Sequence, residues 1–226
     1  GDMTGEYDFF AHTAEVTSID AYDISPGQRK KFFNRLDIDP DIEVNYQIAD
    51  VNQISLPAST YDVVYIQQAF HHLEAIEHVA KEIHNALKPH GIFVLIDYIG
   101  PNQLQRSEKQ RRICGEIWSG LPERLRTTAQ GLVYDQIHIP KIEALPPFEA
   151  VRAEEIMGVL TDTFDVDSLF TYAGILFPLL EGFAQNYTES EEDQQLLAHL
   201  WRLDQELIYA GLVEPNFMRT ILTRKT

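Results

Sequence analysis

The feature of this chain that most constrains its fold is a regular alternation of strand and helix patterns from its start to Ile99. Residues 61–69 (YDVVYIQQA) and 92–97 (IFVLID) carry consecutive apolar side chains, which is typical of strands buried on both faces of a parallel sheet. Between them, residues 73–87 have apolar side chains at the spacing of an amphipathic helix. This order predicts an α/β fold with a doubly wound, mostly parallel sheet.

The remaining pattern adds two early strands, a mostly helical region and two late strands. The expected strands are residues 16–24, 42–48, 61–69, 92–97, 164–172 and 217–224. The expected helices are residues 5–12, 28–36, 73–87, 105–125, 154–160, 175–187 and 189–210. Residues 87–91 (LKPHG) are expected to stop the third of these helices, and the proline-rich residues 127–147 are expected to be irregular.

The acidic composition disfavours several classes of partner. The 226 residues include 18 Lys and Arg against 35 Asp and Glu, a net charge of −17. Such a surface repels phosphate, which argues against nucleic acid and anionic membranes and favours a small-molecule partner. The apolar runs are shorter than the roughly 20 residues of a membrane helix, and the acidic, polar first residues do not suggest a signal peptide.

The single cysteine, Cys114, excludes an internal disulfide and a cysteine-based zinc site. It fits a reducing compartment. We therefore expect a cytoplasmic protein, with a homodimer as an open alternative to a monomer.

Two aspartates stand where the first two expected strands end. Ligands of open parallel sheets bind at the carboxyl ends of the strands. At that place Asp23 could accept hydrogen bonds from both ribose hydroxyls of a nucleoside cofactor, and Asp50 could accept the exocyclic amine of adenine. The alternative for each is an ordinary turn or helix-capping aspartate.

The third strand is followed by two adjacent histidines, His71 and His72. Neighbouring side chains on a strand point to opposite faces, which makes such a pair poor co-ligands of a metal. The sequence offers no carboxylate or cysteine spacing to complete a site. We therefore expect no metal, and a packing role for this loop.

Together these segments resemble a known family. Residues 15–26 (EVTSIDAYDISP), 48–51 (IADV), 61–64 (YDVV), 70–73 (FHHL) and 87–91 (LKPHG) recur in this order and spacing in class I S-adenosylmethionine-dependent methyltransferases. Each piece is weak alone, but the ordered set is specific. In that family a glycine loop follows the first strand, and here only residues 1–4 (GDMT) could be its tail. We therefore expect the first strand and part of this loop upstream of Gly1. A chain without that strand would have a gap in the middle of its sheet.

The resemblance implies S-adenosyl-L-methionine as cofactor and assigns roles to particular residues. Asp23 would hold the ribose and Asp50 the adenine amine, with a backbone contact from Val51. Ile24 would pack on the adenine, and Gln67 would line the methionine portion. The tail of the glycine loop would consist of Gly1, Asp2 and Met3. The resemblance also implies that strand 217–224 inserts antiparallel to the rest, as the hairpin partner of strand 164–172.

Methyl transfer is an in-line displacement for which the protein mainly supplies positioning. A hydroxyl acceptor usually also needs a base, and the candidates are His71, His72, Tyr98 and His138. His71 ranks first because it follows the strand that ends beside the methionine arm, and Tyr98 ranks second. A pocket-shaping role is at least as strong a reading for each of them.

We expect residues 1–100 to form the cofactor-binding core, which is incomplete at its N-terminus, and residues 101–160 to form a helical and irregular cap. Residues 161–226 would complete the core with two inserted helices. The function expected is a small-molecule methyltransferase, O-directed. The alternative is a non-catalytic cofactor-binding or regulatory module on the same fold. A nicotinamide-dependent reductase is disfavoured because no Tyr-x-x-x-Lys pair occurs.

Overall fold

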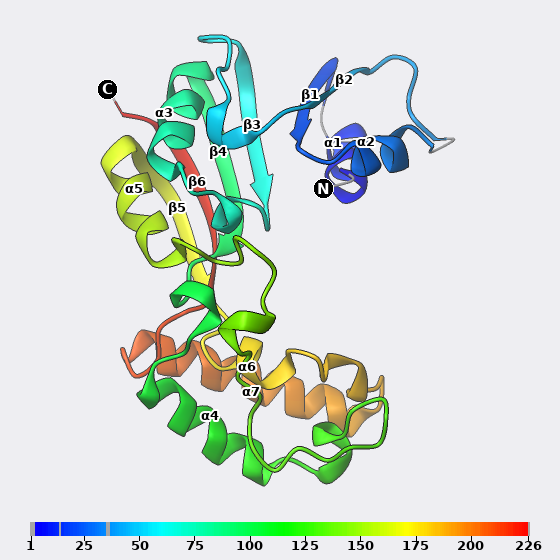
Figure 1. The fold of residues 1–226 in the computed structure, drawn as a ribbon, viewed down its shortest axis with the longest axis vertical. Helices are drawn as coiled ribbons and strands as arrows, with labels where there is room; N and C mark the ends of the chain where they lie inside the picture. Colours follow the sequence, from blue (N-terminus) through cyan, green and yellow to red (C-terminus); the bar gives the residue numbers. More distant parts are fainter. Residues whose placement is uncertain (1–2, 14, 35–36, 226) are drawn as a thin grey trace.

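The computed structural model of the protein describes residues 3–13, 15–34 and 37–225, and its strands form two separate sheets (Figure 1). In the smaller sheet, β1 (Ser18–Asp23) pairs in parallel with β2 (Glu43–Ile48). The larger sheet has the order β3 (Tyr61–Gln67), β4 (Leu87–Tyr98), β6 (Phe217–Arg224), β5 (Phe164–Tyr172). Strands β3 and β4 are parallel, whereas β6 is antiparallel to both β4 and β5. The α/β class, the parallel core and the antiparallel last strand are confirmed.

The sheet is divided between β1 and β3. Within the described residues these strands share no backbone ladder, and only side chains bridge them. The Tyr61 hydroxyl donates to Asp20 Oδ2 (2.7 Å) and lies 3.2 Å from the Tyr22 hydroxyl. Gly1 and Asp2, which were assigned to the tail of the glycine loop, lie outside the described residues.

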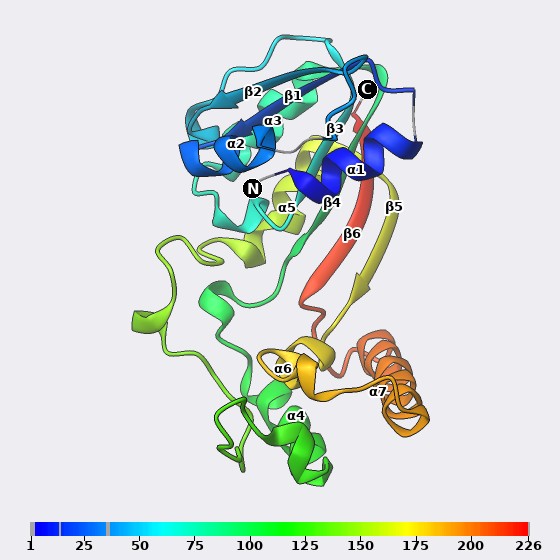
Figure 2. The ribbon, with the colours of Figure 1, turned by 90° about the vertical axis from the view of Figure 1, so that its right-hand side faces the viewer.

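The helices gather in three places (Figures 1 and 2). They are α1 (Thr4–Thr13), α2 (Pro26–Phe33), α3 (Ile76–Ala86), α4 (Glu108–Gly120), α5 (Ile156–Thr163), α6 (Leu176–Leu180) and α7 (Glu191–Tyr209). Helices α1 and α2 accompany the smaller sheet, α3 and α5 cover one face of the larger sheet, and α4, α6 and α7 lie together beyond the end of β5. No helix in the described part of the chain combines the length and apolarity needed to cross a membrane.

Seven single-turn 3₁₀ helices connect these elements in the described part of the chain. They are Val51–Gln53, Phe70–His72, Asn102–Leu104, Glu123–Arg126, Ile142–Ala144, Ala153–Glu155 and Ala184–Asn186.

The main core lies between the larger sheet and its two helices. Ile76, Val79 and Ile83 are buried on one side of α3, which is the amphipathic stripe read from the sequence. They belong to the same cluster as Phe93 and Leu95, the alternate residues of β4 that face this side. A second cluster joins α4, α6 and α7, and a third lies under the smaller sheet. The helical region thus has its own core.

Two predicted boundaries were wrong. Residues 87–91 were expected only to end the helix before them, but they already belong to β4, which begins at Leu87. Gly91 allows β4 to approach β3 here, since a Cβ on it would lie 2.8 Å from the Tyr61 carbonyl oxygen. The helix expected over residues 175–187 is reduced to α6, because the chain turns at Gly182, whose φ of +77° is left-handed.

A buried carboxylate on α7 attaches the helical region to the sheet. Asp204 accepts hydrogen bonds from the backbone N–H groups of Ala173 (2.8 Å) and Ile175 (2.7 Å), which directly follow β5. Ala173 has a φ of 62°, so the chain leaves β5 in a sharp turn that the carboxylate holds.

Candidate active site

The parallel pairing of β1 and β2 brings the ends of both strands together. Asp23, the last residue of β1, pairs with Ile48, and its carbonyl oxygen accepts the Ala49 N–H (3.1 Å). Its Oδ1 accepts the Ser25 N–H (2.7 Å), which fixes the carboxylate at the turn. Ile24 follows with a 70% exposed side chain. The two strand ends predicted to bind the nucleoside therefore lie side by side.

Asp50 is held as an oriented acceptor. One carboxylate oxygen, Oδ1, accepts from the Asn52 backbone N–H (3.0 Å) and side-chain amide (3.1 Å), and the other accepts from Gln53 Nε2 (3.1 Å). These hydrogen bonds, first of all the one from the Asn52 N–H, lower the pKa of Asp50 below its usual value. Asp50 therefore presents a charged carboxylate where β2 ends, with Val51 opening the 3₁₀ turn that follows.

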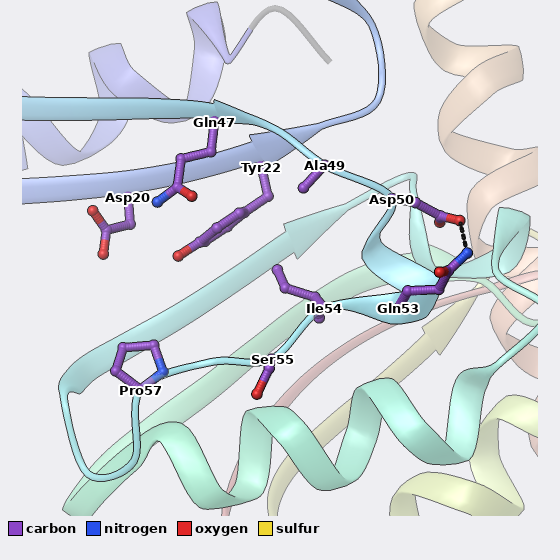
Figure 3. A pocket seen from close by; sticks show the side chains of 9 residues that line it. All are labelled: Asp20, Tyr22, Gln47, Ala49, Asp50, Gln53, Ile54, Ser55 and Pro57. Carbon is purple, nitrogen blue, oxygen red and sulfur yellow. Dashed lines mark hydrogen bonds between the residues drawn. The ribbon is translucent and has the colours of Figure 1, made fainter.

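A hollow of about 550 Å³ borders this edge (Figure 3). Its lining residues are Asp20, Tyr22, Gln47, Ala49, Asp50, Gln53, Ile54, Ser55 and Pro57. Ligand pockets usually have about 300–1,000 Å³, so it has room for a small molecule. Of the residues predicted to bind cofactor, Asp50 lines it, whereas Asp23, Ile24, Val51, Met3 and Gln67 do not.

One wall of the hollow is made by Asp20, Tyr22 and Gln47, which were not predicted from the sequence. Asp20 and Tyr22 stand two positions apart on β1, so they share one face of the strand. That polar alternation was the signal available in the sequence. Met3, the one described residue of the expected glycine-loop tail, is partly buried against the small third cluster instead.

A second group of polar residues follows β3 and β4. Gln67 ends β3 and accepts a hydrogen bond from the Tyr65 hydroxyl (2.5 Å). Gln68 then adopts a φ of 51°, and this turn leads into the 3₁₀ helix that contains both histidines. At the end of β4, Asp97 is fully buried. Sequence reasoning did not name Asp97, although it is the one charged residue in the apolar segment IFVLID.

Asp97 fixes the position and tautomer of His71. Its Oδ2 accepts the N–H groups of Ala69 (3.1 Å) and Phe70 (2.7 Å). Its Oδ1 accepts the Tyr98 N–H (2.7 Å) and makes a short contact with His71 Nδ1. A carboxylate with so many N–H donors can only accept, so Nδ1 carries a hydrogen and Nε2 is the ring nitrogen directed away from Asp97.

The expectation that His71 and His72 point to opposite faces was wrong. They lie in a 3₁₀ turn rather than on a strand, and their ring centroids are 4.0 Å apart. Glu149, from the loop before α5, lies beside both. One of its carboxylate oxygens is 3.5 Å from His71 Nε2 and the other is 3.9 Å from His72 Nδ1. No local sequence signal marks Glu149, because it comes from a distant and irregular segment.

The two other candidate bases differ from His71 in their surroundings. Tyr98 is buried, its hydroxyl donates to the Pro101 carbonyl oxygen (2.9 Å), and burial raises its pKa well above the ordinary value. Its ring lies 6.1 Å from that of His71. His138 is exposed and packs 6.2 Å from the Tyr134 ring, in the irregular segment beside the helical region. The structure therefore groups His71, His72 and Tyr98, whereas the ring contact of His138 is with Tyr134.

Comparison with known proteins identifies the fold to which these strands belong. Residues 4–95 match the family described as "Methyltransferase domain". The matched segment spans α1 to most of β4 and includes both aspartates and both histidines discussed above. The chain has the class I S-adenosylmethionine-dependent methyltransferase fold. The resemblance read from the sequence is thus confirmed.

Individual relatives agree with this fold. A sterol 24-C-methyltransferase of Yarrowia lipolytica is 32% identical over 79 residues, 34% of this chain and 21% of that enzyme. The chain therefore matches about a fifth of that relative's length. An S-adenosylmethionine-dependent methyltransferase from Mesorhizobium loti has a TM-score of 0.53 at 16% identity, covering 99% of this chain and 87% of the other.

A further solved structure contains a form of the cofactor. The Haemonchus contortus phosphoethanolamine N-methyltransferase 2, in complex with phosphomonomethylethanolamine and S-adenosylhomocysteine, has a TM-score of 0.54 at 14% identity. The match covers 99% of this chain and 47% of that one. The family match over residues 4–95 and these solved structures agree on the fold of a methyltransferase domain. The acceptor differs among these proteins, and the fold alone does not determine it.

Proposed function

We propose that this methyltransferase transfers a methyl group from S-adenosyl-L-methionine to a hydroxyl oxygen of a small molecule. The observation that carries the proposal is the placement of two polar sites at the carboxyl ends of parallel strands. Asp23 ends β1, Asp50 lies two residues beyond the end of β2, and the Asp97–His71 pair lies where β4 and β3 end. The first pair suits the nucleoside of the cofactor, and the second suits an acceptor that must lose a proton.

At the first site, the oriented carboxylates of Asp23 and Asp50 would accept hydrogen bonds from the ribose hydroxyls and the adenine amine. The exposed Ile24 side chain is available to pack on the adenine ring, and the Val51 N–H would meet a ring nitrogen. Gln67, at the end of β3, would line the methionine arm. Of these residues, Asp50 also lines the hollow described above, which therefore borders the adenine end of the proposed site.

At the second site, His71 is the proposed base. S-adenosylmethionine, when bound, supplies a methyl group on a sulfonium sulfur. The acceptor hydroxyl would give its proton to His71 Nε2 as its oxygen receives the methyl group from the sulfonium. Asp97, which accepts from Nδ1, stabilises the imidazolium that forms. Tyr98 suits this role less well because its hydroxyl proton is engaged with Pro101.

The test is a screen of hydroxylated sugars, phenols and carboxylic acids with radiolabelled cofactor, followed by substitution of the base. His71→Gln should lower turnover by about 10²–10⁴-fold, the usual contribution of a general base, while cofactor affinity stays the same. His90→Gln, an exposed histidine on β4, is the matched control. If variants of His71, His72, Tyr98 and His138 all keep full activity, positioning alone drives the reaction and the base assignment fails.

A non-catalytic cofactor-binding module is the second candidate. The observation that favours it is the Glu149 carboxylate 3.5 Å from His71 Nε2, which occupies the side of the ring that an acceptor would need. This reading predicts saturable cofactor binding without methylation of any acceptor in the screen. The cytoplasmic location and the choice between a monomer and a homodimer remain predictions from sequence.

A further inference from the structure

Three metal-ligating side chains from separate segments meet beside β3 and β4. His71 and His72 come from the turn after β3, and Glu149 comes from the loop before α5. One ligand atom from each residue lies within 4.8 Å of the other two. We propose that His71, His72 and Glu149 bind a zinc ion. No metal was expected from the sequence, because on a strand the two histidines would point to opposite faces.

The separations fit a shared ion better than hydrogen bonds. Glu149 oxygens lie 3.5 Å from His71 Nε2 and 3.9 Å from His72 Nδ1, and hydrogen bonds between N and O are mostly 2.7–3.2 Å. Zinc holds nitrogen and oxygen ligands at about 2.0–2.2 Å, so two tetrahedral ligands are roughly 3.4 Å apart. Small side-chain movements would therefore close the site around an ion. Three protein ligands leave the fourth position for water.

Asp97 supplies the carboxylate that usually hydrogen-bonds to the second ring nitrogen of a metal-binding histidine. It engages His71 Nδ1, so Nε2 is the ring nitrogen that is turned towards Glu149 and can ligate. A carboxylate behind a ligating histidine fixes its tautomer and raises its basicity. His72 Nδ1 instead lies 3.2 Å from the Phe148 carbonyl oxygen. It would leave that contact and move its proton to Nε2 when it ligates.

The loop that carries Glu149 is held in an unusual conformation. Its neighbours Phe148 and Ala150 have φ values of 71° and 48°, in the left-handed region that disfavours side chains. Ala150 is nonetheless fully buried, and its carbonyl oxygen accepts the Gln103 N–H (2.9 Å). Such strain persists where the surroundings impose it, often at functional sites. Here it fixes the loop that delivers Glu149 to the histidines.

The choice of ion follows from the ligands. Two imidazoles and one carboxylate suit zinc, whereas magnesium and calcium prefer oxygen ligands alone. The net charge of −17 also favours a cation. The site does not depend on the proposed methyl transfer. If both are correct, zinc on His71 Nε2 takes the electron pair that would accept the proton, so zinc would inhibit the reaction.

The test is calorimetric titration of the metal-free protein with Zn²⁺, without cofactor or acceptor. One site per chain should bind more tightly than the background of surface histidines and acids. Glu149→Gln and His72→Gln should each lower the zinc affinity of this site. The loss should be at least about 10–100-fold, which is the usual effect of removing a residue that only hydrogen-bonds to a metal ligand. The matched control His90→Gln should leave the affinity unchanged. Titration with Co²⁺ adds a visible absorption band that reports the coordination geometry and that Glu149→Gln should abolish.

The proposal is overturned if the tight site is absent, or if it persists unchanged in both ligand variants. Circular dichroism of each variant shows that loss of binding does not reflect unfolding, and Glu149→Gln is the safer variant because its side chain is partly exposed. Zinc affinity can be lost in these variants while cofactor binding persists. The experiments can therefore show that the zinc proposal fails while the methyl-transfer proposal holds, or the reverse.

Discussion

Replacing Asp97 by asparagine tests the part of the site that is built most rigidly. The carboxylate accepts hydrogen bonds from three backbone N–H groups and from His71, and it is fully buried. Asparagine keeps one acceptor oxygen. If that oxygen serves Ala69 and Phe70, the amide NH₂ faces the Tyr98 N–H and His71 Nδ1. His71 can then accept from the amide by moving its proton to Nε2, but the Tyr98 N–H has no such option.

A buried N–H group left without an acceptor, here that of Tyr98, costs about 1–3 kcal/mol. We expect the free energy of unfolding of Asp97→Asn to fall by this amount. That is a large part of the roughly 5–15 kcal/mol that stabilises a typical domain. Turnover should also fall because Nε2 now carries a proton and cannot accept one. Urea unfolding followed by far-ultraviolet circular dichroism measures the first effect. Tryptophan fluorescence would report mainly on the helical region, because Trp118 and Trp201 lie in α4 and α7.

The control is Asp165→Asn on β5, where the aspartate is exposed and the change should stay within about 0.5 kcal/mol. A loss for Asp97→Asn no larger than that of the control would refute the reasoning, because it would mean that the buried carboxylate does not satisfy these donors.

Four further predictions concern the rest of the molecule. The Arg124 hydrogen bond, with those of Thr188, holds the pKa of Asp193 well below its usual range. The stabilisation by Asp193 should therefore be present above its unfolded pKa of about 3.9 and be lost as the pH falls, so the melting temperatures of Asp193→Asn and the unmodified protein should converge in acid. Burial raises the pKa of the Cys114 thiol to about 12, so a disulfide reagent at neutral pH should label it only after urea is added, and fast labelling of the native protein would contradict this. Gly174→Ala should lower stability by about 1–3 kcal/mol, because its Cβ would lie 2.8 Å from Val213 Cγ2 and 2.9 Å from the Glu214 carbonyl oxygen. Gly158→Ala in α5, where a Cβ meets nothing within 4 Å, should instead raise stability by about 0.5–1 kcal/mol in the same unfolding assay.

Much of the fold could be predicted because it follows from local periodicity. The strand predicted over residues 61–69 contains β3, the strand predicted over residues 92–97 lies within β4, and the helix predicted over residues 73–87 contains α3. The antiparallel last strand followed from the family resemblance together with the long helix that leads into it. The boundaries at Leu87 and Gly182 were missed because they depend on tertiary contact and on a left-handed backbone angle, which apolar spacing does not encode.

The candidate site was only partly predictable. Asp23 and Asp50 stand at strand ends, a position that sequence reveals directly. The arrangement of the two histidines depended on a 3₁₀ turn after Gln68, and the strand pattern gave the wrong geometry. Glu149 arrives from a segment far away in the sequence, so only the three-dimensional structure could place it beside His71. Residues 150–160 likewise contribute Ala150, Ile156 and Leu160 to the main core, although the sequence placed them in a cap.

The central claim is that Asp23 and Asp50 form the nucleoside end of a cofactor site. The most direct measurement is calorimetric titration of the protein and its Asp23→Ala variant with S-adenosylhomocysteine. The account predicts saturable binding by the unmodified protein and a loss of about 1–3 kcal/mol in the variant, the usual cost of leaving polar partners unpaired. Binding of equal strength by Asp23→Ala would remove Asp23 from the site, and the absence of binding by the unmodified protein would contradict the account.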